Sequence, residues 1–290
     1  MASAKTLDHH TEAAAGTGDG RAGARAARGT VFEDRPLTGS VIAVTADRRR
    51  EELAALLRQA GARIVQSPTA RSAGGEEGRT ARRAGDRAAA SRFVESVLRR
   101  DVHAVTFTTA PGVTALLEAA AVAGSLDRLL EVLREDVLPV CLGPACARPL
   151  EAVGVPSRTA ARPRFSALAG LLCEQLPGRL RREVPLDASR TLVMQGFSAA
   201  VGDHAVLLPP LPAAVLAELA RRPGWVVSRA ELLRRVWDGR DVLGGPTRDE
   251  HAVEATIARL RTALGPAAGL VKTVTKRGYR LAVEPVAADL

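Results

Sequence analysis

The chain is poor in aromatic residues and in cysteine, with one tyrosine, two tryptophans and five phenylalanines among 290 residues. Hydrophobic residues nevertheless make up 46% of it, mainly Ala, Leu and Val, so a sizeable core can form. The length fits two domains plus a tail. The three cysteines, Cys141, Cys146 and Cys173, lack metal-motif spacing. This pattern indicates reduced core thiols in a cytosolic protein and argues against a disulfide framework or a metal site.

No apolar run reaches the length that crosses a membrane, and the first residues lack the apolar segment of a signal peptide. We therefore expect a protein of the bacterial cytoplasm without a membrane partner. The formal net charge of +9 favours a polyanionic partner. Because a compositional preference for arginine produces part of this excess, the charge is weak support for nucleic-acid binding.

Residues 1–36 are rich in Ala, Gly, Thr and Arg and show no apolar period, so we expect a disordered tail. The adjacent His9 and His10 lie in this tail, where such pairs are more often inert than metal-binding. We expect neither a metal site nor a cofactor.

From residue 37 onward, short apolar runs alternate with segments of helical spacing. Strands are expected at residues 40–45, 63–66, 102–107, 137–142 and 156–160. Helices are expected at residues 51–60, 93–99, 111–121, 126–133, 144–153 and 165–175. This alternation predicts a doubly wound, flavodoxin-like α/β domain with a parallel sheet over residues 37–178. Pro139 suggests that the fourth strand is irregular or lies at an edge.

Two polar segments interrupt the pattern. Residues 69–90 have no apolar face before Phe93 and predict a flexible loop, unusually long for a compact domain. Residues 179–190 are polar and rich in arginine, and we expect them to form a linker. A second domain is expected over residues 191–285. It opens with short antiparallel strands at residues 192–194, 199–201 and 205–208, with a hairpin turn at Gly202 and Asp203.

Candidate ligand-binding residues of the first domain lie where its strands end. Thr45 follows the first strand, and Thr108 and Thr109 follow the third, at the edge where doubly wound sheets place ligands. Gly143 opens a helix whose free N–H groups can hold an anion, and Cys146 follows in that helix. The same residues also have a structural interpretation, in which a threonine caps the next helix and Gly143 makes a tight turn. Both interpretations stay open.

Other chemistries of this fold class are not supported. A receiver domain needs a phospho-acceptor aspartate after its third strand, where this chain has Thr108 and Thr109. The sequence also lacks the glycine fingerprint of a dinucleotide site and a phosphate-binding loop.

Three segments of the first domain, residues 37–65, 101–117 and 140–155, resemble uroporphyrinogen-III synthase, which closes a linear tetrapyrrole with inversion of its last ring. The resemblance implies a carboxylate-rich tetrapyrrole as ligand. Within it, Thr109 stands where the family has Ser, and Cys146 where it has Thr. The family holds its substrate between two domains, whereas this chain has residues for only one. The loop at 69–90 lies where much of the middle should be.

The last third of the chain contains the segments WVVSRAELLRRVW (225–237), HAVEATIARLRTAL (251–264) and LVKTVTKRGYRLAV (270–283). Ser228 and Glu231 form a capping box at the start of one predicted helix. A second helix is expected over residues 249–264, with one buried stripe at Val253, Ile257, Leu260 and Leu264. The opposite side is expected to show Ala252, Ala255, Thr256 and Arg259.

In order and spacing these segments resemble the winged-helix DNA-binding domain of OmpR/PhoB-type response regulators. The resemblance implies double-stranded DNA as partner, with the second helix in the major groove and Arg259 reading guanine. His251 and Arg261 are expected to hold phosphates, and Thr256 also matches a contact position. The wing is expected to contribute Thr273, Thr275, Lys276 and Arg277. In the family the loop at residues 238–247 touches RNA polymerase or a partner subunit.

The sequence thus predicts a transcriptional regulator whose first domain either senses a tetrapyrrole or mediates assembly, for instance of a homodimer. One alternative is an active uroporphyrinogen-III synthase that carries an appended DNA-binding domain. Another is a first domain that is an inert remnant of the enzyme.

Overall fold

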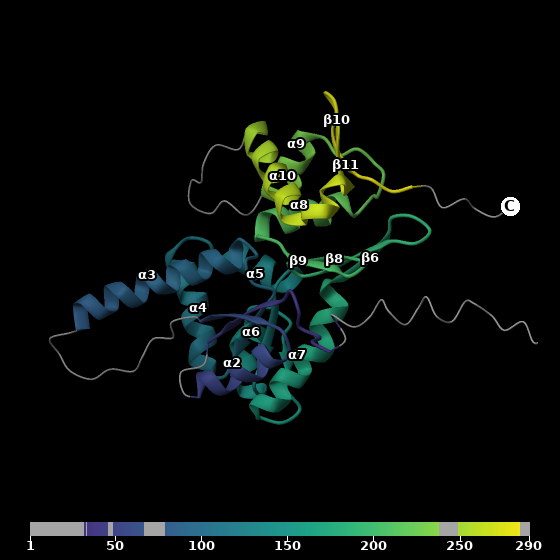
Figure 1. Ribbon diagram of the computed structural model, residues 1–290. Coiled ribbons are helices and arrows are strands. Elements are labelled where there is room, and N and C mark those ends of the chain that lie inside the picture. The colour runs from purple at the N-terminus through teal and green to yellow at the C-terminus, as the bar shows by residue number, and fades with distance from the viewer. Residues whose placement is uncertain (1–31, 33, 46–48, 67–78, 238–248, 285–290) are drawn as a thin grey trace, which may run out of the picture. The chain divides into compact units, whose positions relative to one another are not determined.

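The computed structural model describes residues 32, 34–45, 49–66, 79–237 and 249–284 (Figure 1). Its first part is a parallel sheet with strand order β2-β1-β3-β4-β5. The strands are β1 (Val41–Val44), β2 (Arg63–Gln66), β3 (Ala104–Phe107), β4 (Leu138–Cys141) and β5 (Arg158–Thr159). This order confirms the predicted flavodoxin-like sheet.

Helices cover both faces of the sheet. One face is covered by α2 (Arg50–Gln59) and α7 (Phe165–Leu180). The other carries α3 (Arg79–Leu98), α4 (Ala110–Val122), α5 (Leu126–Glu135) and α6 (Pro144–Ala152). Successive residues of β1 are buried in opposite cores, Val41 and Ala43 in one, Ile42 and Val44 in the other. A strand buried on both sides has no polar face, which explains its continuous apolar sequence.

The structure corrects three expectations about the polar segments. The second half of the loop expected at 69–90 is helical, because α3 begins at Arg79; residues 69–78 lie outside the described residues. Residues 79–92 contain many Ala and Arg, which favour helix without creating an apolar period. The expected tail also ends earlier: Phe32 is buried beneath the Arg181 guanidinium, and the Pro36 carbonyl accepts a hydrogen bond from Gln195.

The linker expected at 179–190 is the third correction. Residues 179–185 belong to α7 and to a strand, and residues 186–190 connect that strand to the next one. Helix α7 runs to Leu180, and β6 (Arg181–Pro185) follows directly. Residues of β6 pair antiparallel with β7 (Thr191–Gln195), burying Val184 opposite Leu192. One inward-facing residue among arginines is too weak an alternation to reveal a strand from sequence alone.

Pro139 lies in an interior strand, contrary to the suggestion of an edge position, because β4 is between β3 and β5. Leu138 and Leu142 donate their N–H groups to β3, to the His103 and Phe107 carbonyls. The intervening nitrogen of Pro139 therefore faces β5. Pairing with β5 begins only at Val140, so the missing N–H costs no hydrogen bond of the sheet.

A four-stranded antiparallel sheet follows, with order β6-β7-β8-β9, where β8 is Ser198–Val201 and β9 is His204–Leu207. The predicted hairpin turn at Gly202 lies between β8 and β9. Gln195 donates from its side-chain amide to the Pro36 and Thr38 carbonyls at 2.8 and 2.9 Å. The N–H of Phe197 reaches the Gly39 carbonyl at 2.8 Å. These hydrogen bonds join the sheet to the segment that precedes β1.

The remaining elements are α8 (Pro210–Leu219), α9 (Arg229–Leu232), the π-helical η1 (Leu233–Trp237), α10 (Glu250–Leu264) and η2 (Gly265–Leu270). The chain then forms an antiparallel hairpin of β10 (Val271–Val274) and β11 (Gly278–Leu281). Three helices followed by a hairpin confirm the predicted winged-helix arrangement. Within the described ranges, no helix combines the length and the apolar character needed to cross a membrane.

Candidate functional site

Helix α10 presents one buried and one exposed stripe. Asp249 caps its start, because its carboxylate accepts the Ala252 N–H at 3.0 Å. The predicted buried stripe is confirmed, with Val253, Ile257, Leu260 and Leu264 all in the core. The exposed residues recur at helical spacing on the opposite side: His251, Glu254, Ala258, Arg259 and Thr262. A helix with this division can lay its exposed stripe against a partner while its core stays closed.

Thr256 does not lie on the exposed stripe, contrary to expectation. Its side chain is 2% exposed, and its hydroxyl donates to the Ala252 carbonyl at 2.8 Å. Thr256 precedes Ile257 of the buried stripe, and the buried side is wide enough to include it. A threonine in this position stabilises the core side of the helix and cannot reach a partner on the other side.

Arg261 is engaged within the domain. Its guanidinium donates to the Val271 carbonyl at 3.1 and 2.8 Å and to the Thr273 hydroxyl at 2.8 Å. Arg261 therefore ties α10 to the first strand of the hairpin, and Thr273 is its partner. No pattern in the sequence predicts this contact, because it depends on the fold bringing β10 alongside the end of α10.

The hairpin carries exposed cations at its turn. Thr275, Lys276 and Arg277 connect the two strands, and the Arg277 N–H donates to the Val274 carbonyl at 2.9 Å. Lys276 adopts a left-handed backbone conformation with φ of 59°. The expected wing residues are thus placed together at one end of a two-stranded ribbon, with Lys272 exposed on the adjoining strand.

Gly278 fixes the hairpin against the segment before α9. Its φ is +135°, and a Cβ at this position would lie 2.1 Å from the Val227 carbonyl oxygen. This close approach allows Val227 and Tyr279 to exchange two backbone hydrogen bonds of 2.8 and 3.0 Å. Only glycine permits that approach, so the position of the wing depends on it.

Arg229 connects α9, α10 and the wing through its side chain. Its guanidinium lies 5.4 Å from the centre of the Tyr279 ring and donates to Glu254 at 3.1 Å. The N-terminus of α9 is capped by Ser228, which accepts the Glu231 N–H at 3.1 Å and so confirms the serine half of the predicted capping box, while the Glu231 carboxylate pairs with Arg235. Neither Arg229 nor Glu254 was identified from sequence, since their spacing of 25 residues carries no periodic signal.

The expected contact loop at residues 238–247 lies outside the described residues.

In the first domain, the hydroxyl groups of Thr45 and Thr109 both lie close to Gly112, in the first turn of α4. A Cβ on Gly112 would lie 3.4 Å from the Thr109 hydroxyl oxygen and 3.6 Å from that of Thr45. Both hydroxyls already have partners, since Thr45 donates to the Thr106 carbonyl at 2.8 Å and Thr109 accepts from the Gly112 N–H at 3.3 Å. Thr109 thus caps α4, as the structural interpretation held, while Thr108 is half-buried beside it.

Gly143 and Cys146 lie at the start of α6, next to the end of β4. Gly143 is the residue before the helix, in an extended conformation, and nothing would meet a Cβ there within 4 Å. Cys146 is buried and contacts Cys141, and the hydrogen bond between them together with burial raises the pKa of the Cys141 thiol. Among the described residues, no cluster of three or more His, Cys, Asp or Glu is placed to hold a metal ion.

Comparison with known families gives two matches that do not overlap. Residues 30–170 match the uroporphyrinogen-III synthase HemD family, and residues 203–281 match the C-terminal domain of transcriptional regulatory proteins. The transcriptional regulatory protein AfsQ1 of Streptomyces coelicolor is 42% identical over 77 residues, which are 26% of this chain and 32% of that protein. The chain therefore matches about a third of that relative's length.

Two solved structures resemble separate parts of the chain. The C-terminal domain of the nisin resistance regulator NsrR is 26% identical, covering 30% of this chain and 87% of that one, with a TM-score of 0.26. The Thermus thermophilus uroporphyrinogen III synthase is 24% identical, covering 47% of this chain and 50% of that one, with a TM-score of 0.27.

Proposed function

We propose that this chain, which carries a HemD-like domain at residues 30–170 and an OmpR/PhoB-type winged-helix domain at residues 203–281, is a DNA-binding transcriptional regulator. The observation that carries the proposal is the exposed stripe of α10 together with the exposed basic turn of the β10–β11 hairpin. Such a protein would act in the bacterial cytoplasm, and RNA polymerase or a second copy of the chain would be its further partners.

Arg259 is the proposed base-reading residue. It is exposed near the middle of the stripe, flanked by Ala258 and a half-exposed Ala255, and these short side chains leave room for α10 to approach base edges. The guanidinium can bind the O6 and N7 atoms of guanine together. His251, in the first turn of α10, would contact a phosphate.

The wing would contribute charge more than sequence recognition. Thr275, Lys276 and Arg277 form its exposed turn, which suits contacts to the DNA backbone beside the minor groove. Arg261 and Thr273 would act indirectly, because their mutual hydrogen bond holds this wing on α10. Thr256 is left out of the proposed interface because its side chain is buried.

The first domain would sense a tetrapyrrole or mediate assembly. The HemD match supports a relation to tetrapyrroles, and it equally favours the rival proposal of an active uroporphyrinogen-III synthase. Within the described residues there is one five-stranded parallel sheet, and this favours the regulator, because the enzyme family that the domain resembles holds its substrate between two such domains. A domain that has lost one wall of its cleft can still bind a ligand or a partner without catalysing ring closure.

The test is selection of duplexes from a random pool by the full-length protein. Enrichment of one motif is expected, and loss of preference at a guanine in that motif is expected for Arg259→Ala. Pools that stay random after repeated selection would contradict sequence-specific DNA recognition.

A second experiment tests sensing by the first domain. The selected duplex is titrated with the protein in the presence and absence of uroporphyrinogen, and the affinity for DNA is expected to change by about fivefold or more.

A further inference from the structure

A surface cavity of about 470 Å³ lies beside the antiparallel sheet, and arginines dominate its walls. Its lining includes six arginines but only two acids, Asp136 and Glu218. The arginines come from separate parts of the chain: Arg100, Arg179, Arg181, Arg182, Arg221 and Arg235. Four of these arginines pair with carboxylates: Arg100 with Asp136, Arg181 with Glu183, and Arg221 and Arg235 with Glu218. The excess positive charge of the cavity therefore comes from the other two, Arg179 and Arg182.

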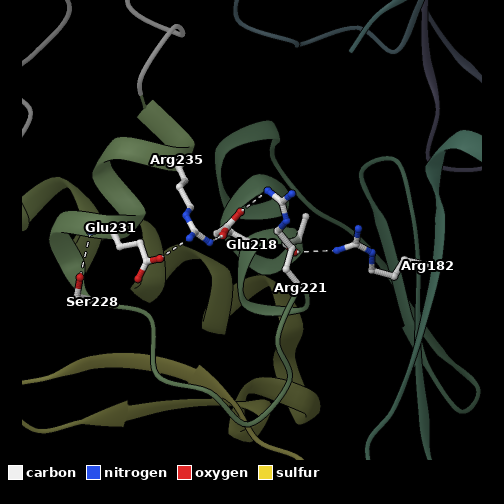
Figure 2. Close-up of polar contacts among 7 residues, drawn as sticks. Arg182, Glu218, Arg221, Ser228, Glu231 and Arg235 are labelled. Atoms are coloured by element: carbon white, nitrogen blue, oxygen red, sulfur yellow. Dashed lines mark hydrogen bonds and ion pairs between the residues drawn. The ribbon is translucent and has the colours of Figure 1, made fainter. Parts of the chain in front are cut away.

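Glu218 shows what these guanidinium groups bind. Its side chain on α8 is 7% exposed, and its two carboxylate oxygens accept from Arg221, at 3.3 Å, and from Arg235 (Figure 2). Arg235 also pairs with Glu231 at 2.5 Å, and its hydrogen bond to Glu218 raises the pKa of Arg235. The interior of this cluster is thus already built around an oxyanion, which the protein itself supplies.

Two other arginines keep most of their donors available. Arg182 on β6 donates to the Ala217 carbonyl at 3.4 Å, next to Glu218, as Figure 2 shows. Arg179 at the end of α7 donates to the Glu135 carbonyl at 3.0 Å. Within the described part of the chain, neither guanidinium is paired with a carboxylate. A guanidinium has five N–H donors, so each can still bind an oxyanion with two parallel hydrogen bonds.

We propose that this cavity binds a small molecule carrying two or more carboxylate or phosphate groups, held by Arg179 and Arg182 beside the Glu218 cluster. The cavity volume lies in the range of small-molecule sites. Arg179 and Arg182 lie on two separate elements, α7 and β6, and an anion with two or more charged groups can bridge them. Neither the HemD match nor the winged-helix match assigns a ligand to these residues.

Isothermal titration of the full-length protein with citrate and with pyrophosphate, at matched ionic strength, tests the proposal. Saturable binding of at least one probe is expected, and the probe that binds distinguishes carboxylate from phosphate recognition. The double variant Arg179→Gln/Arg182→Gln should bind that probe at least tenfold more weakly. The control Arg148→Gln/Arg162→Gln removes two exposed arginines outside the cavity and should bind as the wild type does.

Failure of both probes to saturate, or equal binding by the two double variants, would overturn the proposal. A second measurement separates it from DNA contact. If these arginines held DNA phosphates, Arg179→Gln/Arg182→Gln would lower the salt dependence of DNA binding by about two units of slope. We expect an unchanged slope, and the lowered slope would assign the arginines to DNA instead. Because the titration contains no DNA, its outcome is independent of the proposed regulatory function.

Discussion

The two domains use their candidate functional side chains in opposite ways. In the first domain, the hydroxyl of Thr45 is bonded to a neighbouring strand and that of Thr109 caps a helix. In the winged-helix domain, Arg259, Lys276 and Arg277 are exposed, and none of them forms an ion pair within the described residues. Side chains already bonded inside the fold stabilise it, whereas exposed cations without a carboxylate partner are available to a polyanion.

The difference follows from what each fold needs in order to be complete. The winged-helix domain closes its core with α8, α9, α10 and the hairpin together with strands β6, β7 and β8, and the exposed stripe of α10 lies outside that core. The first domain also closes its core, but the enzyme it resembles needs a facing domain to form a cleft. The five-stranded sheet of the described residues corresponds to one wall of such a site.

The largest effect we expect is the absence of synthase activity. Orienting a flexible substrate between two walls can supply up to ~7–11 kcal/mol of a barrier, and the described residues form one such wall. The purified protein supplied with the linear tetrapyrrole should give the isomer ratio of the spontaneous closure, as heat-denatured protein does. A clear excess of the III isomer would show that the first domain is catalytic, and it would favour the proposal of an active uroporphyrinogen-III synthase.

Gly278→Ala should be the most damaging single substitution in the wing. The added Cβ would lie 2.1 Å from the Val227 carbonyl oxygen at a φ of +135°. Backbone strain and overpacking together predict a loss of about 3 kcal/mol in the free energy of unfolding of the winged-helix domain. Urea denaturation measures the loss. Gly269→Ala is the control, because a Cβ added at Gly269 has no atom within 4 Å, and it should lower the free energy of unfolding far less. A loss in Gly278→Ala as small as that of the control would show that the wing accommodates the Cβ.

Arg259→Ala should weaken binding to the selected duplex by about 1–3 kcal/mol and relax the preference at one base pair. The reason is the loss of a bidentate contact to guanine from the exposed stripe of α10. Arg222→Ala removes the same charge from an exposed position outside α10 and should leave the preference intact. Competition titrations with duplexes altered at single positions measure both. An unchanged preference in Arg259→Ala would remove this residue from the interface.

Neutralising the wing should have a smaller and less specific effect. In Lys276→Asn/Arg277→Ala, asparagine tolerates the left-handed conformation that Lys276 adopts, so the turn should persist. Binding to all duplexes should weaken, and the slope of log affinity against log salt should fall by about one unit per lost phosphate contact. Measuring affinity over a range of salt concentrations tests this. A wild-type slope would mean that the wing stays off the DNA.

The sequence predicted what periodic patterns can encode. The five alternating strands and the stripe of Val253, Ile257, Leu260 and Leu264 depend on local spacing, and both were found. Contacts between distant segments have no such signal. The bond from Arg261 to Thr273 and the antiparallel pairing of β6 with β7 therefore appeared only in the structure. The helical part of α3 before Phe93 was missed because Ala and Arg favour helix without marking an apolar face.

Substitution of Thr256 should have the smallest effect on DNA binding. It also tests whether burial in the free protein excludes a residue from the DNA interface, because the family resemblance alone predicts that Thr256 contacts DNA. In Thr256→Val the side chain keeps its shape and loses the hydrogen bond to the Ala252 carbonyl. The free energy of unfolding should change by about 1 kcal/mol or less, and DNA affinity should stay within about twofold of wild type. Thr262→Val is the matched control, since the Thr262 hydroxyl makes the same type of bond, to the Ala258 carbonyl at 3.1 Å, on the exposed side of α10. Duplex titrations and urea denaturation of both variants separate the loss of a helix bond from the loss of a DNA contact. A tenfold loss of affinity in folded Thr256→Val, absent from Thr262→Val, would show that the buried hydroxyl turns outward to DNA and that burial in the free protein misjudges this interface.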